Sequence, residues 1–557
     1  MNVYNYESLR LIAQTEEGQC FIANLKKAYQ EKYENIPIPP LKYEYFKEYY
    51  ISGDRVKYQQ LYFERRKRLM LLQVLALLED KYLEELEQTL ATICDEFTWV
   101  LPAHCYNVNN DNKFDYTTID LFAAETGAYL AETAYVFKDK LTFDILDRIK
   151  ISVRNKIVEN YEKRTFHFDK EWSHNWAAVC AGSIGIAYLY LFPERFPLVR
   201  ERVFNTMENY LGSLDKDGYC TEGYSYWVYG FGFFSWFMDT YQRIIEERPS
   251  ILDKQIVKNT IKYGKDCILD GNIYLPFADG GSKGEHDEIP LLCIMEELFD
   301  ETLFLPELHE QTESSEALGF HILYALNKNR DDFAIRQGTV YYQTSQVLLF
   351  KNKHYAFAVK GGCNAEIHNH NDIGTFSIVK GQKQLIADLG VGEYTKNYFT
   401  LPDDSENGRY GEKIFVCSSF AHSVPIVNGQ PQKYGAEYRG KVLSQDKNYI
   451  LIDLAKAYQI PIEKLTACYK TEENVVRICY EYQENANITF RFISQIQPKI
   501  DNGRLFVDDM EIKNSERLIP IITSVPYSKY LGESGIAYVI DYMAGRNTQK
   551  MDFEFTL

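Results

Sequence analysis

Ile488-Thr-Phe-Arg-Phe492 and Met551-Asp-Phe-Glu-Phe-Thr-Leu557 alternate apolar and polar side chains without a break. Successive side chains of a β-strand point to opposite faces, so this period of two predicts strands with one buried and one solvated face. Similar short runs, separated by Asn, Gly and Lys, begin near Gly338 and continue to the end of the sequence. They predict an antiparallel β-sandwich over residues 331–557.

The sequence before residue 330 has a different period. Leu83, Leu86 and Leu90 recur at helical spacing in a charged segment. The same kind of pattern covers residues 119–135, 145–161, 176–191 and 257–267. Many helices in succession, with few strand-like runs, predict an all-α domain of helical hairpins over residues 1–330. Two domains also suit a length of 557 residues, which exceeds what one hydrophobic core supports.

The overall charge restricts the partners of this protein. Lys and Arg number 61 and Asp and Glu number 79, which gives a net charge of −18. Nucleic acid is an unfavourable partner for such a chain, and an acidic substrate needs a locally basic cleft. The first residues form no signal peptide and no stretch is apolar enough to span a bilayer, so we expect a cytoplasmic protein that does not enter membranes.

Two of the 10 His lie two residues apart in Asn364-Ala-Glu-Ile-His368-Asn-His370-Asn-Asp372. On a strand, residues two apart point to the same side, so we expect both rings to face one way. The motif is short, and its spacing leaves both a metal site and a purely structural pair open.

Two further residues of metal-ligand type follow in the predicted β-region. Residues 375–379 and 384–388 predict a hairpin that turns at Gly381 and places Asp388 near the end of an apolar strand. His422 lies beside a turn in Ser418-Ser-Phe-Ala-His-Ser-Val-Pro425. Imidazole and carboxylate are ligands that Zn²⁺ takes in proteins. A role for Asp388 as a cap or turn residue stays open.

The helical region has its own polar and aromatic concentrations. Trp172-Ser-His174-Asn175-Trp176 begins a predicted helix, where Asn is also a common cap. Asp217-Gly-Tyr-Cys-Thr-Glu222-Gly-Tyr-Ser-Tyr226-Trp227-Val-Tyr229-Gly230 is rich in Gly and aromatic residues. It fits either a loop whose Tyr residues only pack or a substrate-binding segment.

Four of these segments resemble the heparinase II/III-like polysaccharide lyases. In chain order they are His174-Asn-Trp-Ala-Ala-Val-Cys180, Glu222-Gly-Tyr-Ser-Tyr-Trp227, the His368 and His370 motif, and His422-Ser-Val-Pro-Ile-Val-Asn-Gly429. Trp99-Val-Leu-Pro-Ala-His104 is a weaker match. The resemblance implies an α+β multidomain chain: an N-terminal helical (α/α) toroid followed by a C-terminal antiparallel β-sandwich.

The resemblance also implies roles for single residues. The family's metal, usually zinc, falls on His370, Asp388 and His422, and its catalytic His falls on His368. Its catalytic Tyr falls on Tyr226, with Tyr229 as the alternative because a shift of one helical turn exchanges the two. Asn175 matches a position that binds the substrate carboxylate, although the family varies there. The candidate substrate-binding residues are His174, Trp176, Glu222, Trp227, Tyr398 and Arg409.

The implied activity is β-elimination in an acidic polysaccharide or oligosaccharide that contains uronic acid, with a glycosaminoglycan such as heparan sulfate, hyaluronan or chondroitin sulfate as the expected substrate. An alginate or oligoalginate lyase and a uronate C5-epimerase with the same active site stay open, as does the oligomeric state. A glycoside hydrolase needs two well-placed carboxylates, for which Glu222 and Asp217 are available, but it leaves the histidines without a role. A catalytically inactive carbohydrate-binding protein has no need of the whole set of catalytic and metal residues.

Overall fold

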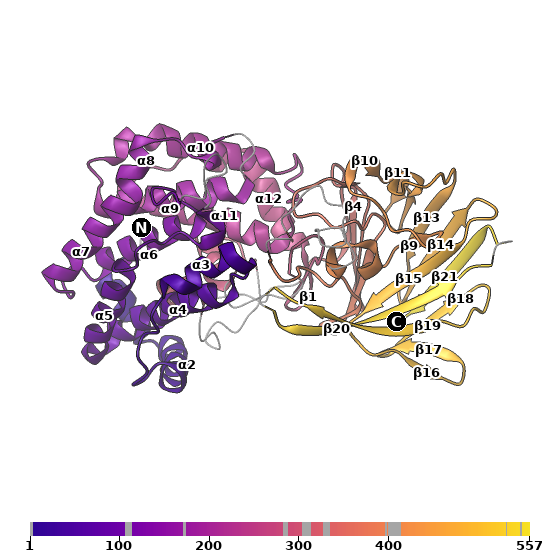
Figure 1. Cartoon of the computed structure of the whole chain (residues 1–557), viewed down its shortest axis with the longest axis horizontal. Helices are drawn as coiled ribbons and strands as arrows, with labels where there is room; N and C mark the ends of the chain where they lie inside the picture. The colour runs from indigo at the N-terminus through magenta and orange to yellow at the C-terminus, as the bar shows by residue number, and fades with distance from the viewer. Residues whose placement is uncertain are drawn as a thin grey trace. The chain divides into compact units, whose positions relative to one another are not determined.

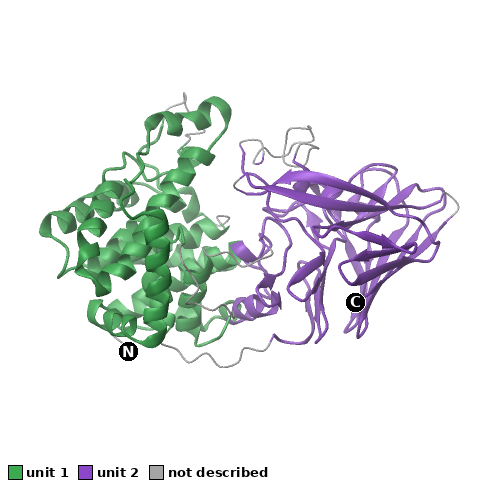
Figure 2. Ribbon diagram, turned by 90° about the horizontal axis from the view of Figure 1, so that it is seen from below, with its two compact units in different colours: residues 1–213, 226–257, 285–333 green, residues 214–225, 258–284, 334–557 purple. Residues whose placement is uncertain are grey.

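The computed structural model of the chain divides into two compact units, which Figure 2 shows in green and purple. Unit 1 comprises Met1–Ser213, Tyr226–Val257 and Glu285–Phe333, and unit 2 comprises Leu214–Ser225, Lys258–Gly284 and Ala334–Leu557. The structure describes residues 4–105, 114–170, 174–281, 288–303, 314–326, 335–395, 398, 414–530, 532–545 and 548–557.

Each unit is built from three separate segments of the chain, so one domain boundary does not divide them. The predicted boundary at residue 330 falls in residues 327–334, outside the described residues, and stays a prediction. Two segments from the helical half, Leu214–Ser225 and Lys258–Gly284, belong to the unit that holds most of the strands. They bring Glu222 and Asp279 into unit 2.

Helices make up unit 1, from indigo to magenta in Figure 1. The α-helices of the described chain are α1 (Tyr6–Ala13), α2 (Glu16–Lys32), α3 (Tyr43–Ser52), α4 (Val56–Leu78), α5 (Leu83–Cys94), α6 (Leu121–Val136), α7 (Phe143–Val153), α8 (Glu159–Lys163), α9 (His174–Leu191), α10 (Arg200–Ser213), α11 (Tyr224–Ile245), α12 (Gln255–Asp266), α13 (Ile289–Phe299) and α14 (Gly319–Ala325).

The central helices of unit 1 are buried on nearly all sides because other helices surround them. Nearly every residue of α6 and α9 is buried, and the two helices pack against each other. Gly182 and Gly185 let α9 approach α11 closely: a Cβ at Gly182 would lie 2.9 Å from the carbonyl oxygen of Phe233. A Cβ at Gly185 would lie 2.4 Å from the ring of Phe237. The predicted helical half is confirmed.

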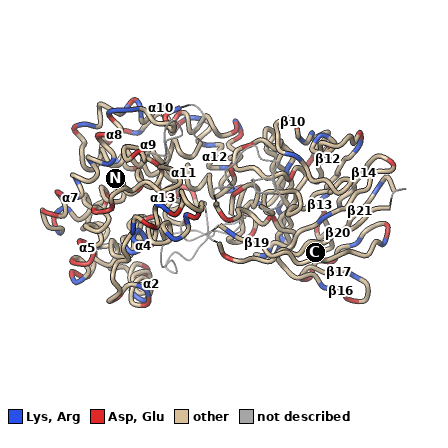
Figure 3. The backbone as a smooth tube through the Cα atoms, in the orientation of Figure 1, with Lys and Arg blue, Asp and Glu red and all other residues tan. Residues whose placement is uncertain are grey.

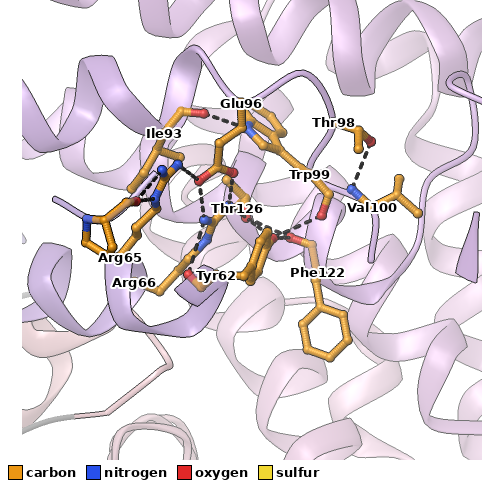
Figure 4. Close-up of polar contacts among 11 residues, drawn as sticks. Tyr62, Arg65, Arg66, Ile93, Glu96, Thr98, Trp99, Val100, Phe122 and Thr126 are labelled. Carbon is orange, nitrogen blue, oxygen red and sulfur yellow. Dashed lines mark hydrogen bonds and ion pairs between the residues drawn. The ribbon is translucent and has the colours of Figure 1, made fainter. Parts of the chain in front are cut away.

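A buried ion cluster ties α4 to the segment that follows α5 (Figure 4). Glu96 Oε1 accepts from Arg65 Nη1 at 2.9 Å and from Arg66 Nη1 at 2.7 Å. Its Oε2 accepts from Arg66 Nη2 at 2.8 Å. Arg66 also donates to Thr126 on α6, and the Tyr62 hydroxyl donates to the carbonyl of Trp99. Every charge in this cluster has an opposite charge beside it.

Antiparallel sheets form most of unit 2. The strands are β1 (Ile268–Asp270), β2 (Ile273–Tyr274), β3 (Gly338–Tyr342), β4 (Val347–Lys351), β5 (Ala356–Lys360), β6 (Cys363–Asn364), β7 (Phe376–Lys380), β8 (Lys383–Ile386), β9 (Pro425–Val427), β10 (Gly435–Arg439), β11 (Lys441–Asp446), β12 (Tyr449–Asp453), β13 (Leu465–Thr471), β14 (Val475–Tyr482), β15 (Ile488–Ser494), β16 (Lys499–Asp501), β17 (Arg504–Val507), β18 (Met510–Asn514), β19 (Ile521–Ser528), β20 (Ser534–Met543) and β21 (Lys550–Thr556).

The sheets pack face to face, as the alternating sequences predict. Within the described residues, an eight-stranded sheet has the order β11-β12-β13-β14-β21-β18-β17-β16, a four-stranded sheet β19-β20-β15-β9 and a five-stranded sheet β3-β4-β5-β7-β8. Phe492 of β15 and Phe553 of β21 lie in different sheets, and their ring centroids are 4.9 Å apart in the shared core. The predicted fold class is confirmed: a helical part followed by a large antiparallel β-region.

The predicted hairpin at residues 375–388 is also confirmed, because β7 pairs with β8 around Gly381. Asp388 lies two residues after the end of β8, an apolar strand. Among the described helices, none has the length and apolar character needed to cross a membrane.

Candidate active site and metal cluster

The His368 and His370 motif lies in a loop between β6 and β7, so its predicted strand conformation is wrong. His368 has a φ of +58°, in the left-handed region, which breaks the alternation of a strand. The two rings are nevertheless brought together by a third residue, Asp279, which no sequence motif had indicated.

The Asp279 carboxylate binds both histidines. Its Oδ2 lies 2.8 Å from Nδ1 of His368, and its Oδ1 lies 2.9 Å from Nε2 of His370. The backbone N–H of Asp279 donates to the carbonyl of His368 at 3.1 Å. The hydroxyl of Tyr398 donates to the same carboxylate, and that of Tyr394 lies 3.3 Å from it. The predicted site residue Tyr398 therefore shares the Asp279 carboxylate with both histidines.

The three predicted metal ligands converge in unit 2. Ligand atoms of His370, Asp388 and His422 lie within 4.8 Å of one another, and all three residues are buried. Nδ1 of His422 is 3.4 Å from Oδ2 of Asp388, and the two imidazole centroids are 5.1 Å apart. Among the described residues, neither of these atoms nor Nδ1 of His370 has a hydrogen-bond partner.

These residues fit a divalent cation. Nε2 of His422 is 2.9 Å from the carbonyl of Val416, which only accepts, so this nitrogen carries the proton. The Asp279 carboxylate likewise requires a proton on Nε2 of His370. In their neutral forms, both rings offer the Nδ1 lone pair to the cluster. Such outer partners are the usual means of orienting imidazole ligands for a metal.

The pKa shifts within the cluster differ in direction. For His422, burial acts to lower the pKa, but Asp388 outweighs it and the pKa lies above its ordinary value. Burial lowers the pKa of His370, which favours its neutral form. For Asp388, burial acts to raise the pKa, but His422 outweighs it and the pKa lies below its ordinary value. Asp388 also accepts from the backbone N–H of Gly390 at 2.9 Å. It is therefore a turn residue as well as a potential ligand.

A second buried ion pair lies next to the cluster. Nζ of Lys360 is 2.8 Å from Oδ1 of Asp372, and both side chains are almost fully buried. Lys360 also donates to Asn369 at 3.3 Å. Oδ2 of Asp372 is 4.0 Å from Nδ1 of His422, so Asp372 adds negative charge close to the cluster.

Glu222 lies on the other side of His368. Its Oε2 is 3.8 Å from Nε2 of His368, which is too long for a hydrogen bond but close enough for charge interaction. The next residue, Gly223, packs against the backbone that follows Asp279, because a Cβ there would lie 2.9 Å from the backbone nitrogen of Gly280. Its φ of +107° is one that glycine adopts readily.

In unit 1, the predicted residues lie on α9 and α11. His174 is the first residue of α9, and Asn175 is buried in its first turn. A Cβ at Gly230 of α11 would lie 3.1 Å from Cβ of Asn175, so these helices are close there. Tyr226 is in the first turn of α11, four residues before Gly230, and is partly buried. The aromatic-rich stretch is thus helical from Tyr224 onward.

Tyr229 has a different environment. Its hydroxyl donates to the buried carboxylate of Glu125 on α6, and burial followed by Glu125 raises the pKa of Tyr229 well above its ordinary value. Burial and then Glu316 raise the pKa of Glu125 as well. Tyr129 lies 3.3 Å from Glu125 and also donates to Glu316. Tyr229 is therefore one member of a hydrogen-bonded group inside unit 1.

The remaining predicted residues differ in their exposure. Trp227 is fully buried and stacks on Phe231 at 5.7 Å, which is a packing position rather than a sugar-binding one. Trp176 is partly buried, with the rings of His104 and His167 at 5.0 and 4.7 Å. Arg409 lies outside the described residues.

No protein-family model matches the chain, and no curated protein matches it. Several solved structures are similar to the chain in fold. Heparinase III matches 100% of this chain and 92% of its own, with a TM-score of 0.63 and 12% identity. The fold is a heparinase-like polysaccharide lyase fold.

Two further solved lyases extend this similarity. A heparan sulfate lyase from Pedobacter heparinus matches 97% of this chain and 88% of its own, with a TM-score of 0.57 and 12% identity. The chondroitin AC lyase of Streptomyces coelicolor, in complex with chondroitin sulphate, matches 99% and 82%, with a TM-score of 0.52 and 7% identity. The expected similarity to heparinases is confirmed at the level of fold.

Proposed function

We propose that this protein is a polysaccharide lyase that cleaves uronic-acid-containing glycans, glycosaminoglycans above all, by β-elimination. One observation carries the proposal: His368 is held through Nδ1 by Asp279, next to a buried cluster of metal-ligand atoms. The heparinase-like fold supports it, since the similar solved structures are named as heparinase III, a heparan sulfate lyase and a chondroitin AC lyase.

The reaction removes the C5 proton, alpha to the uronate carboxylate, and breaks the bond between C4 and the glycosidic oxygen. A C4=C5 double bond forms, and the leaving oxygen takes a proton. The C5 proton is too weakly acidic to leave unless the charge that builds on the carboxylate is stabilised. In this proposal the Asn175 amide donates to that carboxylate.

His368 suits the role of base. With its Nδ1 proton held by Asp279, the lone pair of its neutral ring lies on Nε2. Once Nε2 takes the substrate proton, the Asp279 carboxylate stabilises the resulting imidazolium. Tyr226 suits the role of acid toward the leaving oxygen, because a phenol keeps its proton at neutral pH. A Tyr and a His together serve both epimers at C5, whose protons lie on opposite faces.

Zinc is the ion that we propose for the cluster, held by His370, Asp388 and His422. When bound, it supplies a fixed positive charge that anchors the loop of His370. The net charge of −18 disfavours an acidic substrate at long range, but charged residues of both signs occur along both units (Figure 3). Lys360 supplies one buried cation near the cluster.

The proposal is tested with a panel of heparan sulfate, hyaluronan, chondroitin sulfate and alginate, as polymers and as short oligomers. We expect a rise in ultraviolet absorbance from the unsaturated uronate on at least one glycosaminoglycan. A rise on alginate alone moves the substrate class to alginate. Deuterium uptake at C5 from heavy water without any rise points to an epimerase. No reaction across the panel contradicts the proposal.

A further inference from the structure

The Asp279 carboxylate contacts the rings of both His368 and His370. It is 3% exposed, and its two carboxylate oxygens bind different rings, at 2.8 and 2.9 Å. It comes from the segment Lys258–Gly284, far from the histidines in sequence. Its backbone N–H also bonds the carbonyl of His368, so position and side chain are fixed together.

The two histidines use opposite nitrogens for this contact. His368 uses Nδ1, which leaves Nε2 on the side of Glu222. His370 uses Nε2, which leaves Nδ1 on the side of Asp388 and His422. A carboxylate accepts and does not donate, so it places a proton on each nitrogen that it contacts. One carboxylate thereby sets opposite tautomers in two imidazoles.

A role for Asp279 as a metal ligand is less consistent with the distances. Asp279, His370 and Cys417 form a second group of potential ligands. However, the 2.9 Å between Oδ1 of Asp279 and Nε2 of His370 is a hydrogen-bond length with no room for an ion between the atoms. In addition, Oδ2 of Asp279 is already bonded to His368.

We propose that Asp279 is a positioning residue that holds His368 as the Nδ1–H tautomer and His370 as the Nε2–H tautomer, and so couples the metal cluster to the catalytic base. The part that concerns catalysis rests on the proposed lyase function. The part that concerns tautomers does not, because it follows from contacts within unit 2.

The first test is the wild-type protein with zinc added. Long-range nitrogen–proton NMR correlations of ¹⁵N-histidine-labelled protein distinguish the two neutral tautomers, and His368→Gln identifies the signals of His368 by their loss. We expect a protonated Nδ1 on His368 and a protonated Nε2 on His370. The reverse tautomer on either ring overturns the proposal even if no variant of Asp279 folds.

The second test is Asp279→Asn, which keeps the shape but has one accepting oxygen and one donating NH₂. The NH₂ faces a ring N–H, so one of the two imidazoles must change its tautomer. We expect that change, a 10–100-fold weaker zinc affinity as for other outer-shell partners of ligating His, and a kcat lower by roughly 10²–10⁴-fold with KM within about threefold. Unchanged tautomers and unchanged zinc affinity overturn the proposal.

Asp266→Asn is the matched control. Asp266 is also a fully buried Asp of unit 2, and its carboxylate accepts from the hydroxyl of Tyr342 at 3.0 Å. We expect a lower melting temperature but unchanged His368 and His370 signals, zinc affinity and kcat. If it weakens zinc binding as much as Asp279→Asn, the effect of Asp279 is merely structural and the proposal fails. If the wild type forms no unsaturated product while the tautomers behave as expected, the lyase function fails and the positioning role stands.

Discussion

Two buried carboxylates, Glu96 in unit 1 and Asp279 in unit 2, accept comparable numbers of hydrogen bonds from very different partners. Glu96 is surrounded by the guanidinium groups of Arg65 and Arg66, which stay charged at every pH where the protein is folded. Asp279 is surrounded by the imidazoles of His368 and His370, each with a second nitrogen that is not used for this contact. Burial and bond lengths alone do not distinguish the two.

The two carboxylates differ in the chemistry of their partners, which are guanidinium groups at Glu96 and imidazole rings at Asp279. The Glu96 carboxylate is held by two guanidinium groups with fixed charge, which suits a role in holding α4 against its neighbours. Around Asp279, the second nitrogen of His368 lies toward Glu222 and that of His370 toward the metal-ligand cluster. A buried carboxylate therefore indicates function when its partners are titratable and keep a reactive atom, and structure when its partners are fixed cations.

Tyr226→Phe should have the largest effect on activity. It deletes the hydroxyl that we assign to the leaving group while keeping the ring, so kcat should fall by roughly 10²–10⁴-fold with an unchanged melting temperature. Tyr229→Phe is the matched control on the same helix, because its hydroxyl is engaged with Glu125. We expect it to keep most of its kcat and to lose about 1–3 kcal/mol of stability, since Glu125 loses a donor.

Steady-state kinetics and thermal melts of both variants check this prediction. An inactive Tyr229→Phe beside an active Tyr226→Phe would place the acid one helical turn further along α11. Glu125, which accepts from Tyr229, would then act in catalysis, as we propose for Asp279. Two active variants would remove Tyr from the mechanism.

Glu96→Gln should cost the most stability. It leaves the buried Arg65 and Arg66 without their counter-charge, and breaking a buried ion pair in this way costs about 3–5 kcal/mol. kcat at a temperature where the variant is folded should stay unchanged. Glu473→Gln, at an exposed pair with Lys353, should change stability by less than about 0.5 kcal/mol. Urea unfolding measures both, and a kcat that falls with Glu96→Gln would contradict the purely structural role.

The pattern of the sequence was sufficient for the elements whose environment is uniform. β15 and β21 alternate because one face lies in the core and the other does not, and α9 is apolar throughout because helices surround it. His370, Asp388 and His422 were also identified, through resemblance to a family. In each case the residue types within the segment itself are sufficient for the prediction.

No pattern in the sequence around Asp279 indicates its role. It lies 89 residues before His368, in a segment that belongs to unit 2 with His368, and only the tertiary structure brings the two together. The strand expected at His368 failed because a single residue with positive φ redirects the loop. Trp227 looked like a sugar-binding residue because sequence shows that a ring is present and not whether it is buried.

Metal removal should test the cluster on one side of Asp279. His370→Ala should lose the ion and lower the melting temperature, because an ion bound only by the folded state stabilises it, by about 2.7 kcal/mol at a concentration of 100 Kd. His368→Ala should be inactive but keep both the ion and the melting temperature, since His368 is not a ligand. Elemental analysis and thermal melts with and without zinc measure this. Wild-type protein that neither contains nor is stabilised by a transition metal would contradict the cluster's assignment.

Glu366 allows the smallest and most specific test. It is a partly buried carboxylate in the same loop as His368, and among the described residues no hydrogen-bond donor to it is seen. Burial raises its pKa to about 7; Lys360 opposes this, and Asp215 and Asp372 add to it. Below pH ~4.5 the carboxyl is protonated whether the chain is folded or not. Between pH ~4.5 and pH 7 the unfolded chain releases the proton while the folded chain keeps it, so stability falls as pH rises.

Glu366→Gln should flatten that slope and raise the free energy of unfolding at pH 8 by about 1–3 kcal/mol, whereas exposed Glu437→Gln should leave both unchanged. Urea unfolding at a series of pH values decides the point: a Glu366→Gln variant that loses stability at pH 8 would mean that this carboxylate, like Asp279, is bound in its ionised form by donors of the loop.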